Sequence, residues 1–304
     1  MSTNSCCSSN DTQPEQLHVA IIGSGSGAFA SAIKAAEGGA RVTIIEGADV
    51  IGGCCVNVGC VPSKILIRAA QLAHQQRTNP FDGLENIQPQ LSRSLLAHQQ
   101  TARVEELRGA KYQSILENNP ALSLLKGYAR FKNENTLLVQ MADGSEEELV
   151  ADRILIATGS TPSVPPIDGL IDTPYWTSTE ALFSDVLPSS LVVIGSSVIA
   201  LEIAQAYARL GSSVTVLARH TLLYAEDPLL GEKLTECFEK EGIRVLNNTQ
   251  ASHVSYGSNG FSLETDEGTL IAEKLLISTG RHANTDKLGL ENVGVETDKS
   301  GAIV

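Results

Sequence analysis

A short pattern that occurs twice in this chain leaves few folds open to it: an apolar strand, a glycine-rich loop of small residues, and a helix. In the first copy, Gly23, Gly25 and Ala28 follow the predicted strand 17–22. The first glycine of such a loop makes a tight turn, the second lets the backbone approach a pyrophosphate, and the small third residue packs the helix against the strand. Glu46, which ends the next predicted strand, can accept hydrogen bonds from a ribose. Together these features predict a dinucleotide-binding unit.

The second copy begins 172 residues after the first, at Gly195, and continues with Ser197 and Ala200. It differs at the position that distinguishes the two nicotinamide nucleotides, because Arg219 follows its second strand in place of an acidic residue. An acid would repel the 2′-phosphate of NADPH, whereas an arginine can bind it with two hydrogen bonds. We therefore expect this unit to prefer NADPH over NADH. The alternative is that Arg219 is an ordinary solvated surface arginine.

Two such units predict an α/β protein with two Rossmann-like dinucleotide-binding domains. Each unit later contains a buried strand that ends in small residues, at Thr158 and Gly159 in the first and at Gly280 in the second. The elements predicted between these landmarks are helices at 62–76 and 91–116, and antiparallel strands at 122–131 and 136–141.

A pair of cysteines five residues apart, Cys55 and Cys60, precedes the predicted helix that begins at Pro62. The partial positive charge at a helix N-terminus stabilises a thiolate and lowers the pKa of the thiol. A thiol pair closed by so short a loop predicts a redox-active disulfide. The alternative is half of a structural zinc site, which needs four ligands, and no second Cys or His pair at ligand spacing occurs in the sequence.

Charge and composition exclude several classes of function. The net charge is −13 and the isoelectric point is about 4.9, which argues against a nucleic-acid partner, because such a partner needs a basic face. No apolar run approaches the ~20 residues of a membrane span, and residues 1–16 lack the apolar stretch of a signal peptide. We expect a flexible N-terminal arm and a cytoplasmic protein. Cys6 and Cys7 in that arm are either solvated thiols or ligands that share a soft metal ion.

Two nucleotide units and a redox dithiol together suggest a reaction. Hydride would pass from a nicotinamide to a bound flavin and then to the disulfide, with the cofactors carrying the electrons and the protein positioning them. Lys64 lies one turn beyond Cys60, and Glu202 lies on the helix of the second unit. A buried lysine near a flavin needs a partner of opposite charge, and we predict that Glu202 is that partner.

The stretch from Cys55 to Lys64 resembles the active site of the FAD-dependent pyridine nucleotide–disulfide oxidoreductases, and the resemblance extends over nearly all of residues 17–304. Within that family the chain is most similar to the branch that reduces mercury(II), rather than to the branches that reduce glutathione or lipoamide. The stretches that carry this similarity are residues 59–70, 104–112, 174–182 and 193–197.

The resemblance implies a role for each matching residue. Cys55 would be the interchange thiol, Cys60 the thiolate against the flavin, and both would bind the metal that is reduced. Lys64 and Glu202 would be the pair near the flavin ring. The main chain that lines the FAD site would include Ala28, Ala48, Cys54 and Ala129. The implied reaction converts Hg(II), delivered as a thiol complex, and NADPH into Hg(0), NADP and a proton, and soft Hg(II) does prefer thiolate ligands.

The resemblance also implies the domain organisation and a homodimer for the complete enzyme. The segments, in order, are an arm at 1–16, an FAD-binding domain with the redox disulfide at 17–165, an NADPH-binding domain at 166–285, and the start of the return to the FAD domain at 286–304. The C-terminal dimer-interface domain of the family has no counterpart before Val304, so we expect an incomplete reductase sequence.

One departure from the family lies inside the site. Cys54 stands where the family usually has threonine, so three cysteines crowd together and a disulfide between Cys54 and Cys60 is conceivable. Two alternative functions stay open from the sequence. One is a related reductase of the dihydrolipoamide or glutathione type, and the other is an inactive flavin- or thiol-binding fragment.

Overall fold

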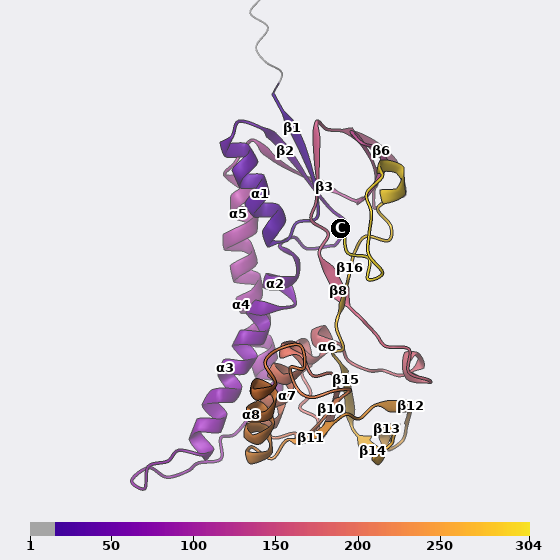
Figure 1. The fold of residues 1–304 in the computed structure, drawn as a ribbon. Coiled ribbons are helices and arrows are strands. Elements are labelled where there is room, and N and C mark those ends of the chain that lie inside the picture. The colour runs from indigo at the N-terminus through magenta and orange to yellow at the C-terminus, as the bar shows by residue number, and fades with distance from the viewer. Residues whose placement is uncertain (1–15) are drawn as a thin grey trace, which may run out of the picture.

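The computed structural model describes residues 16–304, so the predicted arm, with Cys6 and Cys7, lies almost entirely outside the described residues. Two parallel four-stranded sheets lie at opposite ends of the molecule, and two long helices run along one side between them (Figure 1). This arrangement confirms the predicted α/β class with two Rossmann-like units.

The first sheet has the strand order β3-β2-β1-β7, with every neighbouring pair parallel. Its strands are β1 (His18–Ile22), β2 (Arg41–Glu46), β3 (Leu122–Lys126) and β7 (Arg153–Ile156). Helix α1 (Ser26–Glu37) crosses from β1 to β2 and covers one face. Successive β1 residues point to opposite faces, so Ile21 packs under α1 with Phe29, while Ile22 packs on the other face with Phe131. Burial on both faces explains why β1 is apolar at every position from Val19 to Ile22.

The second sheet repeats this design with the order β11-β10-β9-β15, again entirely parallel. Its strands are β9 (Ser190–Ile194), β10 (Ser213–Ala218), β11 (Arg244–Asn247) and β15 (Lys274–Ile277). One face is covered by the helices α6 (Ser178–Phe183), α7 (Val198–Leu210) and α8 (Pro228–Lys240). The other face is covered by an antiparallel sheet of β12 (Ala251–Gly257), β13 (Gly260–Thr265) and β14 (Gly268–Ala272).

The strand predicted at 122–131 is in fact two strands, which corrects the sequence interpretation. β3 belongs to the parallel sheet, and after Gly127 the chain turns into β4 (Tyr128–Asn133) of a separate antiparallel sheet with β5 (Thr136–Gln140) and β6 (Glu146–Val150). The physical reason is the tight fit at Gly127, where a Cβ would lie 2.6 Å from the side chain of Val139. The sequence does not reveal the change of sheet, because residues on both sides of Gly127 have the mixed apolar and polar pattern of a half-buried strand.

The helices between β2 and β3 also begin and end at places that differ from the prediction. α2 (Gly53–Asn57) precedes α3 (Cys60–Arg77), so Cys60 is the first helical residue and Pro62 the third, not the first. Pro62 is tolerated because N–H groups in the first turn have no intrahelical partner. The predicted helix 91–116 is α4 (Arg93–Arg108), a π-helical turn η1 (Gly109–Gln113) and α5 (Ser114–Glu117).

The long helices connect the two sheets. α3 begins beside the first sheet and ends against α7, where its Leu66 and Ala70 join the core of the second unit. α4 reaches the same region through Arg93 and Gln100, which both donate to the Leu182 carbonyl near the end of α6, at 2.6 and 2.7 Å. A cation is favourable at a helix C-terminus.

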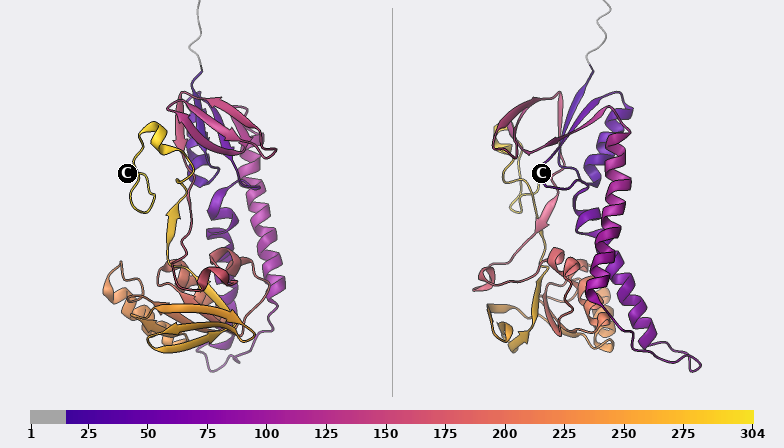
Figure 2. Two further views of the ribbon diagram at one scale, coloured as in Figure 1. Left: turned by 90° about the vertical axis from the view of Figure 1, so that its right-hand side faces the viewer. Right: turned by 180° about the vertical axis from the view of Figure 1, so that it is seen from behind.

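A thin ribbon connects the two units on the other side (Figure 2). It consists of β8 (Ser160–Pro162) paired antiparallel with β16 (Arg281–Ala283). The short helices η2 (Leu170–Asp172) and η3 (Leu290–Val293) follow these strands. In the described part of the chain, no helix is both long and apolar enough to cross a membrane.

We predict that Gly53→Ala lowers the free energy of unfolding by about 2 to 4 kcal/mol. Gly53 has a φ of +65°, and a Cβ there would lie 2.5 Å from Cα of Gly25, which is backbone and has little room to move. The measurement is chemical denaturation followed by circular dichroism. Gly27→Ala is the control, because a Cβ at Gly27 meets nothing within 4 Å. That variant should be unchanged or up to about 1 kcal/mol more stable, since alanine favours a helix over glycine.

Candidate active site

Three thiols gather where α2 passes into α3. Cys54 and Cys55 lie on α2, and Cys60 is the first residue of α3. All three are free thiols; Cys54 and Cys60 are exposed, and Cys55 is half-buried. α3 is 18 residues long, and its N-cap, Gly59, contributes no capping side chain, so the positive end of the helix is directed to Cys60 without competition from a cap.

The pKa of the Cys55 thiol is raised above its ordinary value. The largest cause is a hydrogen bond with Cys60, followed by burial and by the negative charge of a Cys60 thiolate. Lys111 acts in the opposite direction, and Cys54 adds a smaller upward contribution. Cys55 and Cys60 therefore lie close enough to interact, as the two members of a dithiol must.

Hydrogen bonds of the Asn57 side chain hold the short helix α2 in place. Asn57 is buried, and its amide donates to the carbonyls of Ile51 at 2.8 Å and Gly53 at 3.0 Å. Its side-chain oxygen accepts from Arg108 of α4 at 3.1 Å. The sequence analysis missed Asn57 and Arg108, because they are 51 residues apart and match no spacing pattern. A buried asparagine inside a cysteine motif was the only indication available.

Arg281 is a further residue that the sequence did not place at the site. It starts β16, and its guanidinium donates to the hydroxyl of Ser160 at 2.8 Å and also to the Ser160 carbonyl. The same group lies 3.8 Å from Sγ of Cys54. The ribbon between the two units thereby contacts the thiol cluster.

Lys64 and Glu202 form an ion pair between α3 and α7. The predicted partners are thus brought together, although the Lys64 side chain is 60% exposed, not buried as expected for a lysine that needs such a partner. Beside the pair lies a cavity of about 310 Å³, lined by the two helices. The residues that line it are Lys64, Ile67, Ala70, Glu202, Gln205, Ala206 and Arg209.

The first glycine-rich loop lies at the carboxyl end of β1. Gly23 has a φ of +106°, and a Cβ there would lie 2.3 Å from the Ala157 carbonyl oxygen, so the position requires glycine. Glu46, at the end of β2, accepts from the Ser24 backbone at 3.2 Å, from the Ser24 hydroxyl at 2.5 Å and from the Ala48 backbone at 2.8 Å. The carboxylate predicted to bind a ribose therefore also orders the loops on either side of it.

The other residues predicted for this nucleotide site fall into two groups. Ala28 and Ala129 are buried, on α1 and β4, whereas Ala48 is exposed in the loop after β2. Thr158 and Gly159 follow β7, and both of their carbonyls accept from Asn284, from its side chain at 2.9 Å and its backbone at 3.0 Å. Asn284 was not predicted, because it reaches this loop from the far end of the chain.

The second glycine-rich loop repeats the geometry of the first. Gly195 has a φ of +143°, and a Cβ there would lie 2.2 Å from the Ser278 carbonyl oxygen. Ser197 is the N-cap of α7, and Ala200 is fully buried beneath it. Gly280 follows β15 with a φ of +140°. In each unit the first glycine of the loop thus packs against the residue that directly follows the next parallel strand: Ala157 after β7, and Ser278 after β15.

Both loops present a helix N-terminus that has no side-chain cap. Gly25 and Ser197 are the N-caps of α1 and α7, and neither makes a side-chain capping bond. By contrast Ser92, Thr177 and Asp227 do cap their helices α4, α6 and α8. Uncapped N–H groups at a helix N-terminus are available to an anion such as a pyrophosphate.

Arg219 comes directly after β10 and is exposed. Within residues 16–304 it forms no hydrogen bond or ion pair, so its guanidinium is available to a ligand. It lies at the carboxyl end of the second parallel sheet, the edge where nucleotides bind in open α/β sheets.

The described residues contain no group of three or more His, Cys, Asp or Glu side chains that could hold a metal ion, so they form no metal centre of the zinc type. A structural zinc ion needs four ligands. Cys55 and Cys60 together offer two, which suits a soft two-coordinate metal ion better than zinc.

Comparisons with known proteins point to one family. Residues 17–304 match the family model described as pyridine nucleotide-disulphide oxidoreductase. A mercuric reductase of Shewanella putrefaciens is 73% identical over all of this chain and 55% of its own length, and one of Acidithiobacillus ferrooxidans is 56% identical over 98% and 54%. The chain thus spans about half the length of the curated relatives that it matches.

A solved structure with the same fold is the Cu(II) complex of the HOCl-induced flavoprotein disulfide reductase RclA from Escherichia coli. It is 29% identical to this chain, with a TM-score of 0.83, and the match covers 95% of this chain and 62% of that one.

We predict that replacing Cys60 by serine accelerates alkylation of Cys55 by iodoacetamide at pH 8. Cys60 is the main cause of the raised pKa of Cys55, so its removal lowers that pKa and raises the thiolate fraction at a fixed pH. The measurement is the pH profile of alkylation, followed by peptide mass spectrometry. Cys54→Ser is the matched control and should change the Cys55 rate much less, because Cys54 is the smallest contributor. Equal rates in the wild type and in Cys60→Ser would contradict the contact.

Proposed function

Because this chain belongs to the pyridine nucleotide-disulphide oxidoreductase family, we propose that it is the cofactor-binding and dithiol-bearing part of a reductase that uses NADPH and FAD to convert Hg(II) into Hg(0). The observation that carries the proposal is the pair of free thiols, Cys55 on α2 and Cys60 at the start of α3, at the junction of these two helices. The curated relatives named mercuric reductase support mercury as the substrate.

The substrate is a soft cation, and the two thiols are the ligands that such a cation prefers. Hg(II) arrives as a complex with small thiols, and Cys55 and Cys60 replace those ligands one at a time. The proton on Cys55 leaves with the displaced thiolate. The overall reaction converts Hg(II) and NADPH into Hg(0), NADP⁺ and one proton. We assign Cys55 as the interchange thiol and Cys60 as the thiolate that would lie against the flavin.

The first unit fits FAD. The positive φ of Gly23, the uncapped start of α1 and the open space around Gly27 leave the backbone accessible to a pyrophosphate. Glu46 is placed to accept from a ribose hydroxyl. FAD, when bound, supplies the electron transfer between nicotinamide and dithiol. The residues assigned to hold it are Gly23, Gly25, Ala28, Glu46, Ala48, Cys54, Lys64, Ala129, Thr158 and Gly159.

The second unit fits NADPH. The uncapped start of α7 suits the pyrophosphate, and the unpaired Arg219 suits the 2′-phosphate. The residues assigned to this site are Gly195, Ser197, Ala200, Arg219 and Gly280. Lys64 and Glu202 form an ion pair that joins α3 to α7, and we assign this pair to the neighbourhood of the flavin ring.

The division of the chain follows from the same proposal. We assign residues 17–165 and 286–304 to the FAD domain and residues 166–285 to the NADPH domain. The β8–β16 ribbon supports this division, because both crossings between the two sheets pass through it. We further propose that the complete protein is a homodimer in the cytoplasm, where a reducing environment maintains free thiols.

The direct test replaces the matching segment of the Shewanella putrefaciens relative by this chain. We expect NADPH oxidation that depends on Hg(II), with release of elemental mercury, and complete loss of that activity in Cys55→Ala and Cys60→Ala. The measurements are NADPH absorbance and mercury vapour. Reduction of lipoamide or glutathione disulfide without reduction of Hg(II) would show a related disulfide reductase instead. Retained mercury reduction in either cysteine variant would move the chemistry to another thiol, with Cys54 the first to test.

A second test concerns the nucleotide and uses this chain alone. Arg219→Glu should weaken NADPH binding by at least about tenfold and leave NADH binding nearly unchanged, because it replaces a phosphate-binding fork by a like charge. Binding is measured by titration of nucleotide fluorescence. Arg244→Glu makes the same charge change at an exposed position on β11 and serves as the control. Equal losses of NADPH and NADH in Arg219→Glu would overturn the assignment.

A further inference from the structure

The loop of residues 47–52 joins β2 to α2, and so connects the ribose-binding carboxylate to the thiol helix. Its two ends are fixed by backbone hydrogen bonds. Gly127 donates to the Glu46 carbonyl at 3.0 Å, and Gly52 donates to the Ser24 carbonyl, also at 3.0 Å. Between these ends, Ala48, Asp49 and Val50 are all exposed.

One side chain supports the middle of this loop. The ammonium of Lys126 donates to the carbonyl of Ala48 at 2.6 Å and to the carbonyl of Asp49 at 2.9 Å. Lys126 can reach them because it is paired with Glu46 across β3 and β2, so its side chain leaves the sheet at the edge where the loop begins. A charged donor makes a stronger hydrogen bond than a neutral one.

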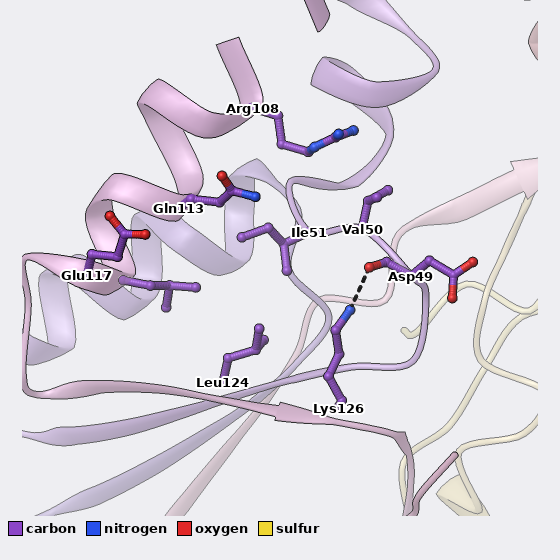
Figure 3. Close-up of a pocket in the computed structure, with 9 residues that line it drawn as sticks. Asp49, Val50, Ile51, Arg108, Gln113, Glu117, Leu124 and Lys126 are labelled. Atoms are coloured by element: carbon purple, nitrogen blue, oxygen red, sulfur yellow. Dashed lines mark hydrogen bonds between the residues drawn. The ribbon is translucent and has the colours of Figure 1, made fainter. Parts of the chain in front are cut away.

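The far side of the loop has little packing. A cavity of about 450 Å³ lies between the loop and the helical segment that contains the π-helical turn. Figure 3 shows the residues that line it. Asp49, Val50 and Ile51 form one wall, and Lys126 and Leu124 close its base. Ala48, Asp49 and Val50 are exposed, whereas Ile51 packs in the core of the first unit. The contacts of Lys126 therefore support the part of the loop that has no side-chain packing.

Tyr128, two residues after Lys126, also supports the loop. A Cβ on Gly47 would lie 2.4 Å from the ring of Tyr128, so this ring rests directly on the loop backbone. The segment from Lys126 to Tyr128 thus contacts the loop through an ammonium group, a backbone N–H and an aromatic ring.

The shape of the loop decides how Glu46 is presented. The Ala48 N–H donates to Oε1 of Glu46 at 2.8 Å, and the carbonyl of the same residue accepts from Lys126. These two groups belong to successive peptide units on either side of the Ala48 Cα, so a change of the Ala48 backbone that releases its carbonyl from Lys126 also displaces its N–H from Oε1. The carboxylate then keeps only the bonds that its Oε2 accepts from Ser24. The Lys126 ammonium therefore acts on the Glu46 carboxylate through the loop backbone, since the described residues show no ion pair between the two side chains.

From these contacts we propose that Lys126 is a positioning residue, whose ammonium holds the 47–52 loop in the shape that presents Glu46 and Ala48 to a dinucleotide. The identity of that dinucleotide as FAD rests on the proposed function. The ordering of the loop by Lys126 does not, so the two statements can be tested separately.

The first arm of the test uses this chain without cofactor. Lys126→Met keeps the apolar stem and removes the ammonium, and amide hydrogen exchange of residues 47–52 should become about fivefold faster. Lys126→Arg, which restores charged donors, should return the exchange towards the wild-type rate. Lys132→Met is the matched control, because Lys132 is an exposed lysine on β4 that binds Glu148 away from the loop. Unchanged loop exchange in Lys126→Met would overturn the proposal.

The second arm measures FAD binding by flavin fluorescence and NADPH binding by titration. In Lys126→Met we expect FAD affinity to fall about fivefold and NADPH affinity to stay unchanged, since the second unit is remote from the loop. Faster loop exchange with unaltered FAD affinity would overturn the positioning role. A wild-type chain that binds no FAD would count against the proposed function, and the exchange experiment would still decide whether Lys126 orders the loop.

Discussion

The close approach of two backbones, at Gly25 and Gly53, is the contact on which the site depends. A Cβ on Gly53 would lie 2.5 Å from Cα of Gly25, so only glycine lets the first nucleotide loop touch the start of α2. The thiol helix is thereby placed against the loop that is proposed to hold a pyrophosphate. Cys60 follows at the next helix start. A side chain at Gly53 would separate the dithiol from the nucleotide loop, whereas a Cβ on Gly25 would lie 3.9 Å from Cα of Gly53, an ordinary contact distance.

Helix α3 extends this local arrangement to the second unit. It starts at Cys60, pairs Lys64 with Glu202 of α7, and buries Leu66 in the second core. Because a helix is rigid over this length, the distance from the dithiol to α7 is set by helix geometry and not by the thin β8–β16 ribbon. The ribbon contributes in another way, since Arg281 ties it to Cys54 and Ser160. The two nucleotide units are thus connected on both sides of the thiols.

The distribution of charge supports this arrangement in a strongly acidic chain, whose net charge is −13. Cations lie at the places where anions are expected: Lys111 near Cys55, Arg281 beside Cys54, and Arg219 at the second nucleotide edge. An acidic surface around a few such cations favours selective binding of anionic groups there over general binding of polyanions. Lys126 is a different case, because its ammonium binds carbonyls of the chain itself.

The sequence by itself determined the α/β class, both glycine-rich loops, the Cys55–Cys60 pair and the position of Arg219. Each of these depends only on local residue spacing or on the periodicity of strands and helices. It also indicated Glu202 as the partner of Lys64, from charge alone. Only the tertiary structure decided that the stretch 122–131 divides into two strands at Gly127, and that Arg108 donates a hydrogen bond to Asn57. It also decided which side chains reach loops that are distant in the sequence, namely those of Asn284, Arg281 and Lys126. These contacts join residues that no short-range pattern relates, and which side chain meets a given carbonyl depends on how the sheets and helices pack.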